Sequence, residues 1–247
     1  MHRRLSFAFI GIILVALAWP LHAQQQRPNI VLIVVDDLRF DEIGVGGHPY
    51  LETPNIDRLA AEGAMFTSAY HSTPLCSPNR ASILTGQYVS RHGILDNTSR
   101  SHASHRLDLF PKDLQKAGYT TAHVGKWHMG NDPTPRPGYD YWVSFDGQGK
   151  TYDPDLYENG RIHPVKGYIT DIFTDRAIDF IKTNKDQPFF IYLPHAMPHK
   201  PLAVSDNFYT PDTPGNLYED VIDELDHCVG QVLDALDRMD LSEKTLV

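Results

Sequence analysis

Short apolar runs alternate with amphipathic segments along the 247 residues of this chain. The run NIVLIVV at residues 29–35 has no polar side chain after its first position, which predicts a strand buried on both faces of a parallel sheet. Two further apolar runs predict strands at residues 120–126 and 189–193. The helical patterns lie at residues 53–63, 80–86, 110–117, 170–182 and 218–239. This alternation predicts an α/β sandwich in which a mostly parallel central sheet is flanked by helices.

The segment between residues 131 and 167 lacks such a pattern. It is rich in Pro, Gly, Asp and Tyr, and we expect a long excursion of loops there. Long loops inside compact domains usually carry function. We find no internal repeat, low-complexity tract or interdomain linker, so residues 24–247 are expected to belong to one domain.

The first 23 residues have a different character. A basic start at residues 1–4 is followed by an apolar stretch at residues 5–19 and by the small residue Ala23. This order predicts a secretory signal peptide at residues 1–23, so that the mature chain is exported to the periplasm or the extracellular space. The stretch is too short and wrongly flanked for a stable membrane anchor, and an uncleaved anchor is the alternative interpretation.

Charge and cysteine content narrow the set of partners. The formal net charge of −9 argues against nucleic acid or an anionic membrane as the main partner. The chain has two cysteines, Cys76 and Cys228, and a disulfide between them is the simplest interpretation in an exported protein. Cys228 lies on a predicted helix, where a small apolar residue is expected, so we favour two free thiols.

Candidate chemistry gathers where the predicted strands end, which is where open α/β sheets bind ligands. Asp36 and Asp37 directly follow the first strand, and two adjacent carboxylates repel each other unless a cation joins them. A hard divalent ion with oxygen ligands fits such a pair. The alternative is that one carboxylate caps a turn while the other faces water.

Cations and imidazoles follow the other two strands. Lys126 and His128 would point to the same side of an extended segment, so that a cation and a titratable imidazole share one face. Such a pair suits holding an anionic oxygen while moving a proton, although a surface lysine and a packed histidine would give the same pattern. His195 and His199 follow the third strand among rigid prolines, and ordinary loop histidines are the alternative there.

The stretch Cys76-Ser77-Pro78-Asn79-Arg80 has the form C-x-P-x-R and follows a proline in what the sequence indicates is a loop. It therefore lacks the usual means of activating a thiol, a neighbouring histidine or a helix N-terminus. The pattern resembles the signature of the type I sulfatases. Further phrases resemble that family in the same order, over nearly the whole mature chain: residues 27–38 (RPNIVLIVVDDL), 53–60 (TPNIDRLA), 125–128 (GKWH) and 199–202 (HKPL).

This resemblance implies an alkaline-phosphatase-like fold and a sulfuric ester hydrolase. It implies that a formylglycine-generating enzyme converts Cys76 to formylglycine, whose hydrated aldehyde is the nucleophile held by Arg80. It also implies that Asp36 and Asp37 bind calcium, with magnesium as the alternative, and that the modified Cys76 contacts the same ion.

The remaining roles follow from the same resemblance. Lys126 and His199 would bind the sulfate, and His199 would protonate the leaving alcohol, with His195 as the alternative. His128 would remove the proton whose loss expels sulfate. The substrate would be a sulfated carbohydrate or an aryl sulfate ester. Phrases within residues 91–98, 152–160 and 168–171 resemble the branch that acts on 6-sulfated glucosamine and mucin sugars.

The chain also departs from the family pattern. The family completes its metal site with an Asp-Asn or Asp-His pair before a glycine, after the last helix seen here, and the sequence stops at Val247 before such a pair. We therefore expect residues 24–247 to be the N-terminal part of a catalytic domain, without the rest of the metal site and with little activity alone. Two other functions stay open: a phosphonate or phosphate ester hydrolase of the same superfamily, and a non-catalytic binder of sulfated glycans.

Overall fold

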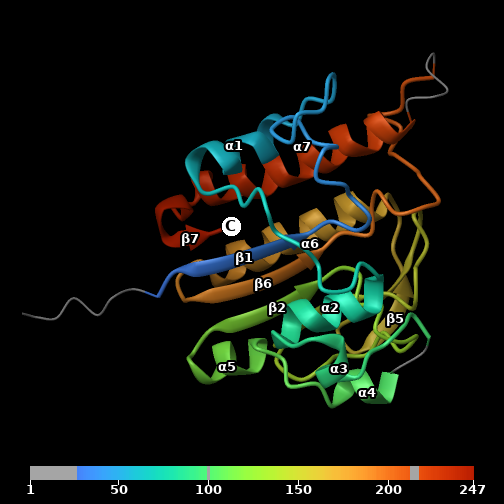
Figure 1. The fold of residues 1–247 in the computed structure, drawn as a ribbon. Helices are drawn as coiled ribbons and strands as arrows, with labels where there is room; N and C mark the ends of the chain where they lie inside the picture. Colours follow the sequence, from blue (N-terminus) through green and yellow to red (C-terminus); the bar gives the residue numbers. More distant parts are fainter. Residues whose placement is uncertain (1–26, 99–100, 212–216) are drawn as a thin grey trace, which may run out of the picture.

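The computed structural model describes residues 27–98, 101–211 and 217–247, so the predicted signal peptide lies outside the described residues. One seven-stranded sheet runs through the molecule in the order β5-β4-β3-β2-β6-β1-β7, with helices on both faces (Figure 1). The elements are β1 (Asn29–Val34), α1 (Pro54–Glu62), α2 (Cys76–Thr85), α3 (Val89–His92), α4 (Ser101–His105), α5 (Pro111–Lys116), β2 (Thr120–Val124), β3 (Tyr141–Ser144), β4 (Asp155–Glu158), β5 (Arg161–Pro164), α6 (Ile169–Asn184), β6 (Phe189–Pro194), α7 (Leu217–Arg238), a 3-10 turn (Ser242–Lys244) and β7 (Thr245–Leu246). This confirms the predicted α/β sandwich with a mostly parallel sheet.

The buried strand β6 lies between β1 and β2 and runs parallel to both. Its side chains alternate between two cores. Ile191 and Leu193 belong to the core that includes α6 and α7, whereas Phe190 and Tyr192 belong to the core that includes α2. Both faces are covered, so every position of β6 is buried, which explains the largely apolar run in the sequence.

The longest helix, α7, packs against α6 and α1 on one face of the sheet. Its predicted apolar face is buried and consists of Val221, Leu225, Val229, Val232 and Leu236. Cys228 lies on the same helix, where its thiol contacts Asp171 at 3.6 Å, and both cysteines are free thiols. Among the described residues, no helix is both long and apolar enough to cross a membrane.

The segment expected to be a continuous loop excursion, residues 131–167, contains three strands. β3 continues the parallel part of the sheet, and β4 and β5 form an antiparallel hairpin. Asn159 and Gly160 make its two-residue turn with φ of 52° and 80°. The expectation was wrong because strands of four residues are too short to show a periodic pattern, although the Asn-Gly pair was a readable hairpin signal.

Candidate functional site

The carboxyl ends of three neighbouring strands meet at one edge of the sheet. β1, β6 and β2 are adjacent and parallel, so the residues that follow them lie side by side. Asp36 follows β1, Lys126 follows β2, and His199 follows β6. The structure thus brings residues from three distant parts of the sequence to one edge, as the sequence pattern predicted.

Cys76 is the first residue of α2, whereas the sequence indicated a loop. The helix can begin here because Leu75 is extended and because Pro78 occupies the first turn, where a backbone N–H would have no helical partner. Gly86 ends the helix in the left-handed conformation, with φ of 65°. The loop expectation was therefore wrong. The correction matters, because the N–H groups and dipole of a helix start favour negative charge beside Cys76.

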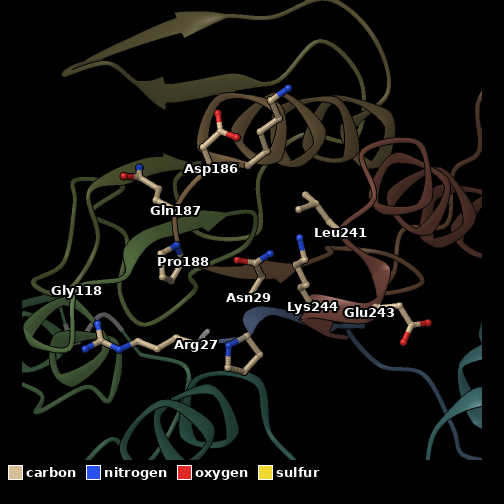
Figure 2. Close-up of a pocket in the computed structure, with 11 residues that line it drawn as sticks. Arg27, Asn29, Gly118, Asp186, Gln187, Pro188, Leu241, Glu243 and Lys244 are labelled. Carbon is tan, nitrogen blue, oxygen red and sulfur yellow. The ribbon is translucent and has the colours of Figure 1, made fainter. Parts of the chain in front are cut away.

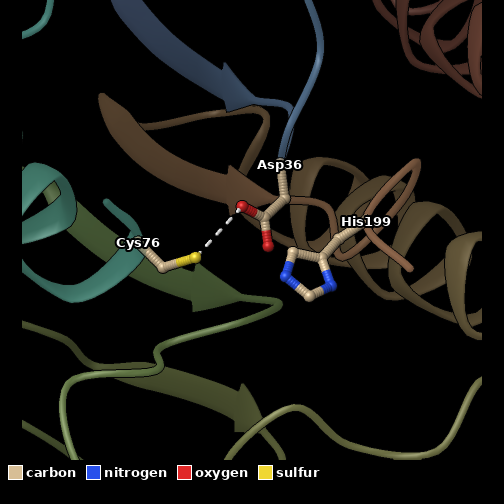
Figure 3. A group of neighbouring side chains, drawn as sticks. All are labelled: Asp36, Cys76 and His199. Atoms are coloured by element: carbon tan, nitrogen blue, oxygen red, sulfur yellow. Dashed lines mark hydrogen bonds between the residues drawn. The ribbon is translucent and has the colours of Figure 1, made fainter. Parts of the chain in front are cut away.

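Three candidate ligand atoms form a compact group. One atom each from Asp36, Cys76 and His199 lies within 4.8 Å of the other two (Figure 3). The Sγ of Cys76 is 3.8 Å from Oδ1 of Asp36. The side chains come from the end of β1, the start of α2 and the loop after β6. They therefore meet only through the tertiary fold.

Two buried cations flank Asp36. Lys126 donates a hydrogen bond to Oδ2 of Asp36, and Nη2 of Arg80 lies 3.5 Å from the same oxygen. Burial opposes ionisation of Asp36, but the charges of Arg80 and Lys126 outweigh it and lower the pKa of Asp36 below its ordinary value. Burial also lowers the pKa of Lys126, and the Asp36 carboxylate partly offsets that effect.

Two further contacts tie α2 to the segment after β2. Arg80 donates from Nη1 to the carbonyl oxygen of Lys126 at 2.6 Å, and Ser77 donates from Oγ to the carbonyl oxygen of His128. The backbone N–H of Ser77 donates to Oδ1 of Asn97 at 2.9 Å. Ser77 and Asn97 could not be predicted as site residues, because no local sequence pattern indicates contacts between residues 20 and 51 positions apart.

His128 reaches the site by a route that differs from the prediction. β2 ends at Val124, and His128 has a left-handed φ of 50°. Lys126 and His128 therefore do not belong to one extended segment, in which their side chains would point to the same side. The predicted extended conformation was wrong, yet His128 lies close enough to Lys126 and Arg80 for their charges to change its pKa. Burial, followed by the charges of Lys126 and Arg80, lowers the pKa of His128 to about 4, so its imidazole is neutral at neutral pH.

The two histidines after β6 have different surroundings. His199 donates from Nδ1 to the carbonyl oxygen of Lys200 at 2.7 Å, which leaves Nε2 for the site. His195 is fully buried, and neither of its ring nitrogens has a partner among the described residues. Burial lowers the pKa of His195 to about 4. Its expected contact with substrate therefore stays a prediction without a supporting contact.

Asp37 separates from its neighbour. Asp36 is buried, whereas Asp37 is exposed, has a φ of 66° and lies outside the group of close ligand atoms. An aspartate tolerates this left-handed conformation better than most residues, because its short side chain can bond locally. The role of Asp37 as a metal ligand stays a prediction.

A cavity of about 170 Å³ opens beside Lys126 and His199. Its other polar lining comes from Gln148, Lys150, Thr151 and Lys200, and no described residue in the lining carries a carboxylate. Gln148 accepts a hydrogen bond from Lys126. Sequence reasoning missed Gln148 because it lies in the segment expected to be loops and has no local signal. The cavity therefore offers an anionic group several cations, although Lys126 is paired with Asp36 and Lys150 with Asp155.

A larger cavity of about 1060 Å³ lies at the opposite edge of the sheet (Figure 2). Asn29 at the start of β1 and Pro188 just before β6 bound it, together with the exposed charges of Arg27, Lys185 and Glu243. None of the described residues that line it is a histidine or a cysteine. Since sheets of this type bind ligands at the carboxyl edge, we assign the candidate site to the smaller cavity and the cysteine group beside it.

The described donors fit one side of a divalent-cation site. Asp36 offers a carboxylate, the ligand type that calcium and magnesium prefer. The thiol of Cys76 and the imidazole of His199 are softer donors, and Asp37 lies outside the group. Because calcium takes about six to eight oxygen ligands, these residues would hold it only together with further oxygen donors.

Comparison with known proteins agrees with this geometry. The sulfatase family model matches residues 28–247. The chain is 36% identical to N-acetylgalactosamine-6-sulfatase of Mus musculus over 90% of its length. It is 38% identical to N-acetylglucosamine-6-O-sulfatase of Bacteroides thetaiotaomicron over 84% of its length. The crystal structure of Ps i-CgsB in complex with k-i-k-neocarrahexaose matches with a TM-score of 0.77 and 31% identity, over 89% of this chain and 57% of that one.

The match is to part of these proteins. The chain spans 49% of the mouse relative and 38% of the bacterial relative. Within that part, the mostly parallel sheet with helices on both faces matches the fold of the Ps i-CgsB structure. The family match covers nearly all described residues, and the chain therefore belongs to the sulfatase family.

Proposed function

We propose that the protein hydrolyses sulfate esters of carbohydrates. One observation carries the proposal: a cysteine at a helix start lies within 4.8 Å of a buried carboxylate and an imidazole, beside two buried cations. A sulfate ester is an anion, and cations already held in a buried site stabilise the charge that grows on it in the transition state. The names of two relatives specify 6-sulfated amino sugars, which supports carbohydrate substrates. Aryl sulfate esters would serve as simpler substrates for the same chemistry.

Cys76 is the residue that would be modified to formylglycine, by a formylglycine-generating enzyme during export. A hydrated aldehyde at this position supplies a nucleophile that can release its sulfate again, which a plain thiol cannot do. Arg80, held by the carbonyl oxygen of Lys126, would orient the modified side chain. Lys126 and Nε2 of His199 would bind sulfate oxygens from the cavity side.

Two histidines would move protons. With protons on both ring nitrogens, His199 would donate from Nε2 to the leaving alcohol and become neutral, while the bond from Nδ1 to the carbonyl oxygen of Lys200 orients its ring. His128 would accept a proton from the modified Cys76. A pKa of about 4 makes His128 a weak base, and a bound sulfate would raise that pKa because an anion favours the charged imidazole.

Asp36 would hold a divalent cation together with Asp37, and we favour calcium over magnesium because calcium accepts irregular sets of oxygen ligands. When bound, such a cation would lower the energy of negative charge on the sulfate oxygens. Lys126 and Arg80 both contact the Asp36 carboxylate. These two cations offset the negative charge of Asp36 and fix the orientation of its side chain.

The test compares sulfate release by the full-length enzyme, coexpressed with a formylglycine-generating enzyme, from 6-sulfated N-acetylglucosamine and 4-nitrophenyl sulfate. We expect turnover, a peptide mass that shows the aldehyde at Cys76, and complete loss of turnover in Cys76→Ala. Cys228→Ala is the matched control, because Cys228 is buried on α7 and lies outside the group of close ligand atoms.

Other outcomes would favour the other functions. Faster turnover of phosphate or phosphonate esters than of sulfate esters would indicate the esterase of the same superfamily. Binding of sulfated sugars without turnover, with affinity unchanged in Cys76→Ala, would indicate a non-catalytic binder. Either result would contradict the proposal.

A further inference from the structure

The loop that carries His199 is held at its far end by side chains from outside the loop. It follows β6 and has no regular secondary structure from residue 195 to residue 204. Tyr168 donates from Oη to the carbonyl oxygen of Ala203 at 2.9 Å, and Tyr152 donates to the carbonyl oxygen of the next residue, Val204. Two consecutive carbonyl groups are therefore fixed by two tyrosine hydroxyls.

A third contact extends this attachment. The backbone N–H of Ser205 donates to Oε2 of Glu224 at 2.8 Å, and Glu224 is fully buried on α7. Tyr168 is 4% exposed, whereas Tyr152 is 47% exposed, and the three hydrogen bonds are part-buried. The bond of Tyr168 should therefore be the costlier of the two tyrosine bonds to lose, because its freed groups would meet less water.

The tyrosines belong to the same structural unit as the cavity wall. Thr151 and Ile169 line the cavity beside His199, and they are the chain neighbours of Tyr152 and Tyr168. The N–H of Ile169 donates to the carbonyl oxygen of Thr151 at 2.9 Å, and the two tyrosine rings lie 5.6 Å apart. The segments that contain Thr151 and Ile169 form one wall of the cavity. Their tyrosines, Tyr152 and Tyr168, hold the loop with His199 that forms the other wall.

The short distance along the chain lets this attachment act on His199. Three residues separate His199 from Ala203, and one of them, Pro201, has a restricted φ. Pro198 restricts the chain on the other side of His199. We therefore expect a shift of the tethered carbonyls to move His199 as well.

We propose that Tyr168 and Tyr152 are positioning residues that hold His199 at the distance needed to protonate the leaving alcohol, with Glu224 fixing the end of the loop. The inference rests on the proposed function. It predicts a dependence on the leaving group: an alkyl alcohol needs the proton from His199, whereas 4-nitrophenolate, a weakly basic leaving group, departs with little help.

The test uses Tyr168→Phe, Tyr152→Phe and the double variant of the full-length enzyme. Tyr119→Phe is the matched control, because Tyr119 Oη also donates to a backbone carbonyl, that of Pro28, at 2.9 Å but at the opposite edge of the sheet. We expect kcat on 6-sulfated N-acetylglucosamine to fall about tenfold in the double variant. On 4-nitrophenyl sulfate it should fall less than about twofold, and Tyr119→Phe should match the wild type on both esters.

Equal losses on the two esters, or no loss on either, would overturn the inference while leaving the proposed function intact. Absence of turnover by the wild-type enzyme on both esters would instead overturn the proposed function and, with it, this inference. Hydrogen exchange gives a readout apart from activity: the amide of Ser205 should exchange faster in Glu224→Leu than in Glu224→Gln, which keeps an acceptor oxygen. Equal exchange rates in the two variants would show that Glu224 does not hold the end of the loop through Ser205.

Discussion

The two edges of the sheet differ in how their charges are held. At the carboxyl edge, Asp36, Arg80 and Lys126 are each at most 7% exposed and contact one another beside a cavity of about 170 Å³. At the amino edge, a cavity of about 1060 Å³ is lined by charged side chains that face solvent. The smaller cavity carries the candidate chemistry.

We therefore used the burial of charge, and not the size of the cavity, as the guide to the candidate site. Charges in water are screened and cost little to place, so they carry little information about function. Charges removed from water cost stability unless they are paired, and such groups are retained where their fields act on a ligand or a reaction. Substitutions at the two edges should therefore have unequal effects.

The largest expected effect is on catalysis. His199→Ala should lower kcat for 6-sulfated N-acetylglucosamine by about 10²–10⁴-fold, because the leaving alcohol loses its proton donor. Lys185→Ala at the amino edge should change kcat by less than about twofold, as expected for an exposed residue. Initial rates of sulfate release by the two full-length variants decide this. A comparable loss in both would mean that the edges do not differ in function.

The next effect is on stability. Asp36→Asn removes the carboxylate that pairs two buried cations, and breaking a buried ion pair costs about 3–5 kcal/mol. Asp186→Asn at the amino edge should stay within about 0.5 kcal/mol, since Asp186 is exposed. Urea unfolding of the metal-free full-length variants measures both. If Asp36→Asn is as stable as the wild type, the buried charges are not coupled as the structure indicates.

A smaller loss is expected from replacing one arginine with lysine at each edge. Arg80→Lys keeps the charge but loses the fork that reaches both Asp36 and the carbonyl oxygen of Lys126, which should cost about 1.5–3 kcal/mol. Arg27→Lys changes an exposed arginine that donates to the carbonyl oxygen of Ala117, and should cost less than about 0.5 kcal/mol. Equal unfolding midpoints for the two variants would argue against a geometric role for Arg80.

The smallest effect is a dependence of stability on pH at the carboxyl edge. Burial lowers the pKa of His195 to about 4, so the unfolded chain binds a proton at higher pH than the folded chain does. The stability that neutral His195 contributes is complete above its ordinary pKa and is lost as pH falls toward 4. Between pH 7 and pH 5 the free energy of unfolding should fall by about 2 kcal/mol from this group.

His195→Leu should remove this part of the pH dependence. Urea titrations of the wild type and the variant at the two pH values supply the measurement. An unchanged difference between pH 7 and pH 5 in His195→Leu would show that His195 is not held neutral in the folded protein.

Much of the candidate site could be predicted from the sequence because strand ends are marked by where apolar runs stop. Asp36, Lys126 and His199 follow such runs, and adjacent parallel strands bring them to one edge. Gln148 could not be predicted, because its contact with Lys126 depends on how residues 131–167 fold back over the sheet. The attachment of Ala203 by Tyr168 was hidden for the same reason.

The fold class, the order of the principal elements and the residues at the carboxyl edge could all be predicted from the amino-acid sequence. These depend on local patterns of apolar and polar positions, which can be read without knowing the rest of the fold. The structure was needed to show that Cys76 begins a helix, that Asp36 is buried while Asp37 is exposed, and that His195 lies in the core. The physical reason is that burial and charge pairing are set by residues far away in the sequence, so adjacent carboxylates or nearby histidines can have opposite environments.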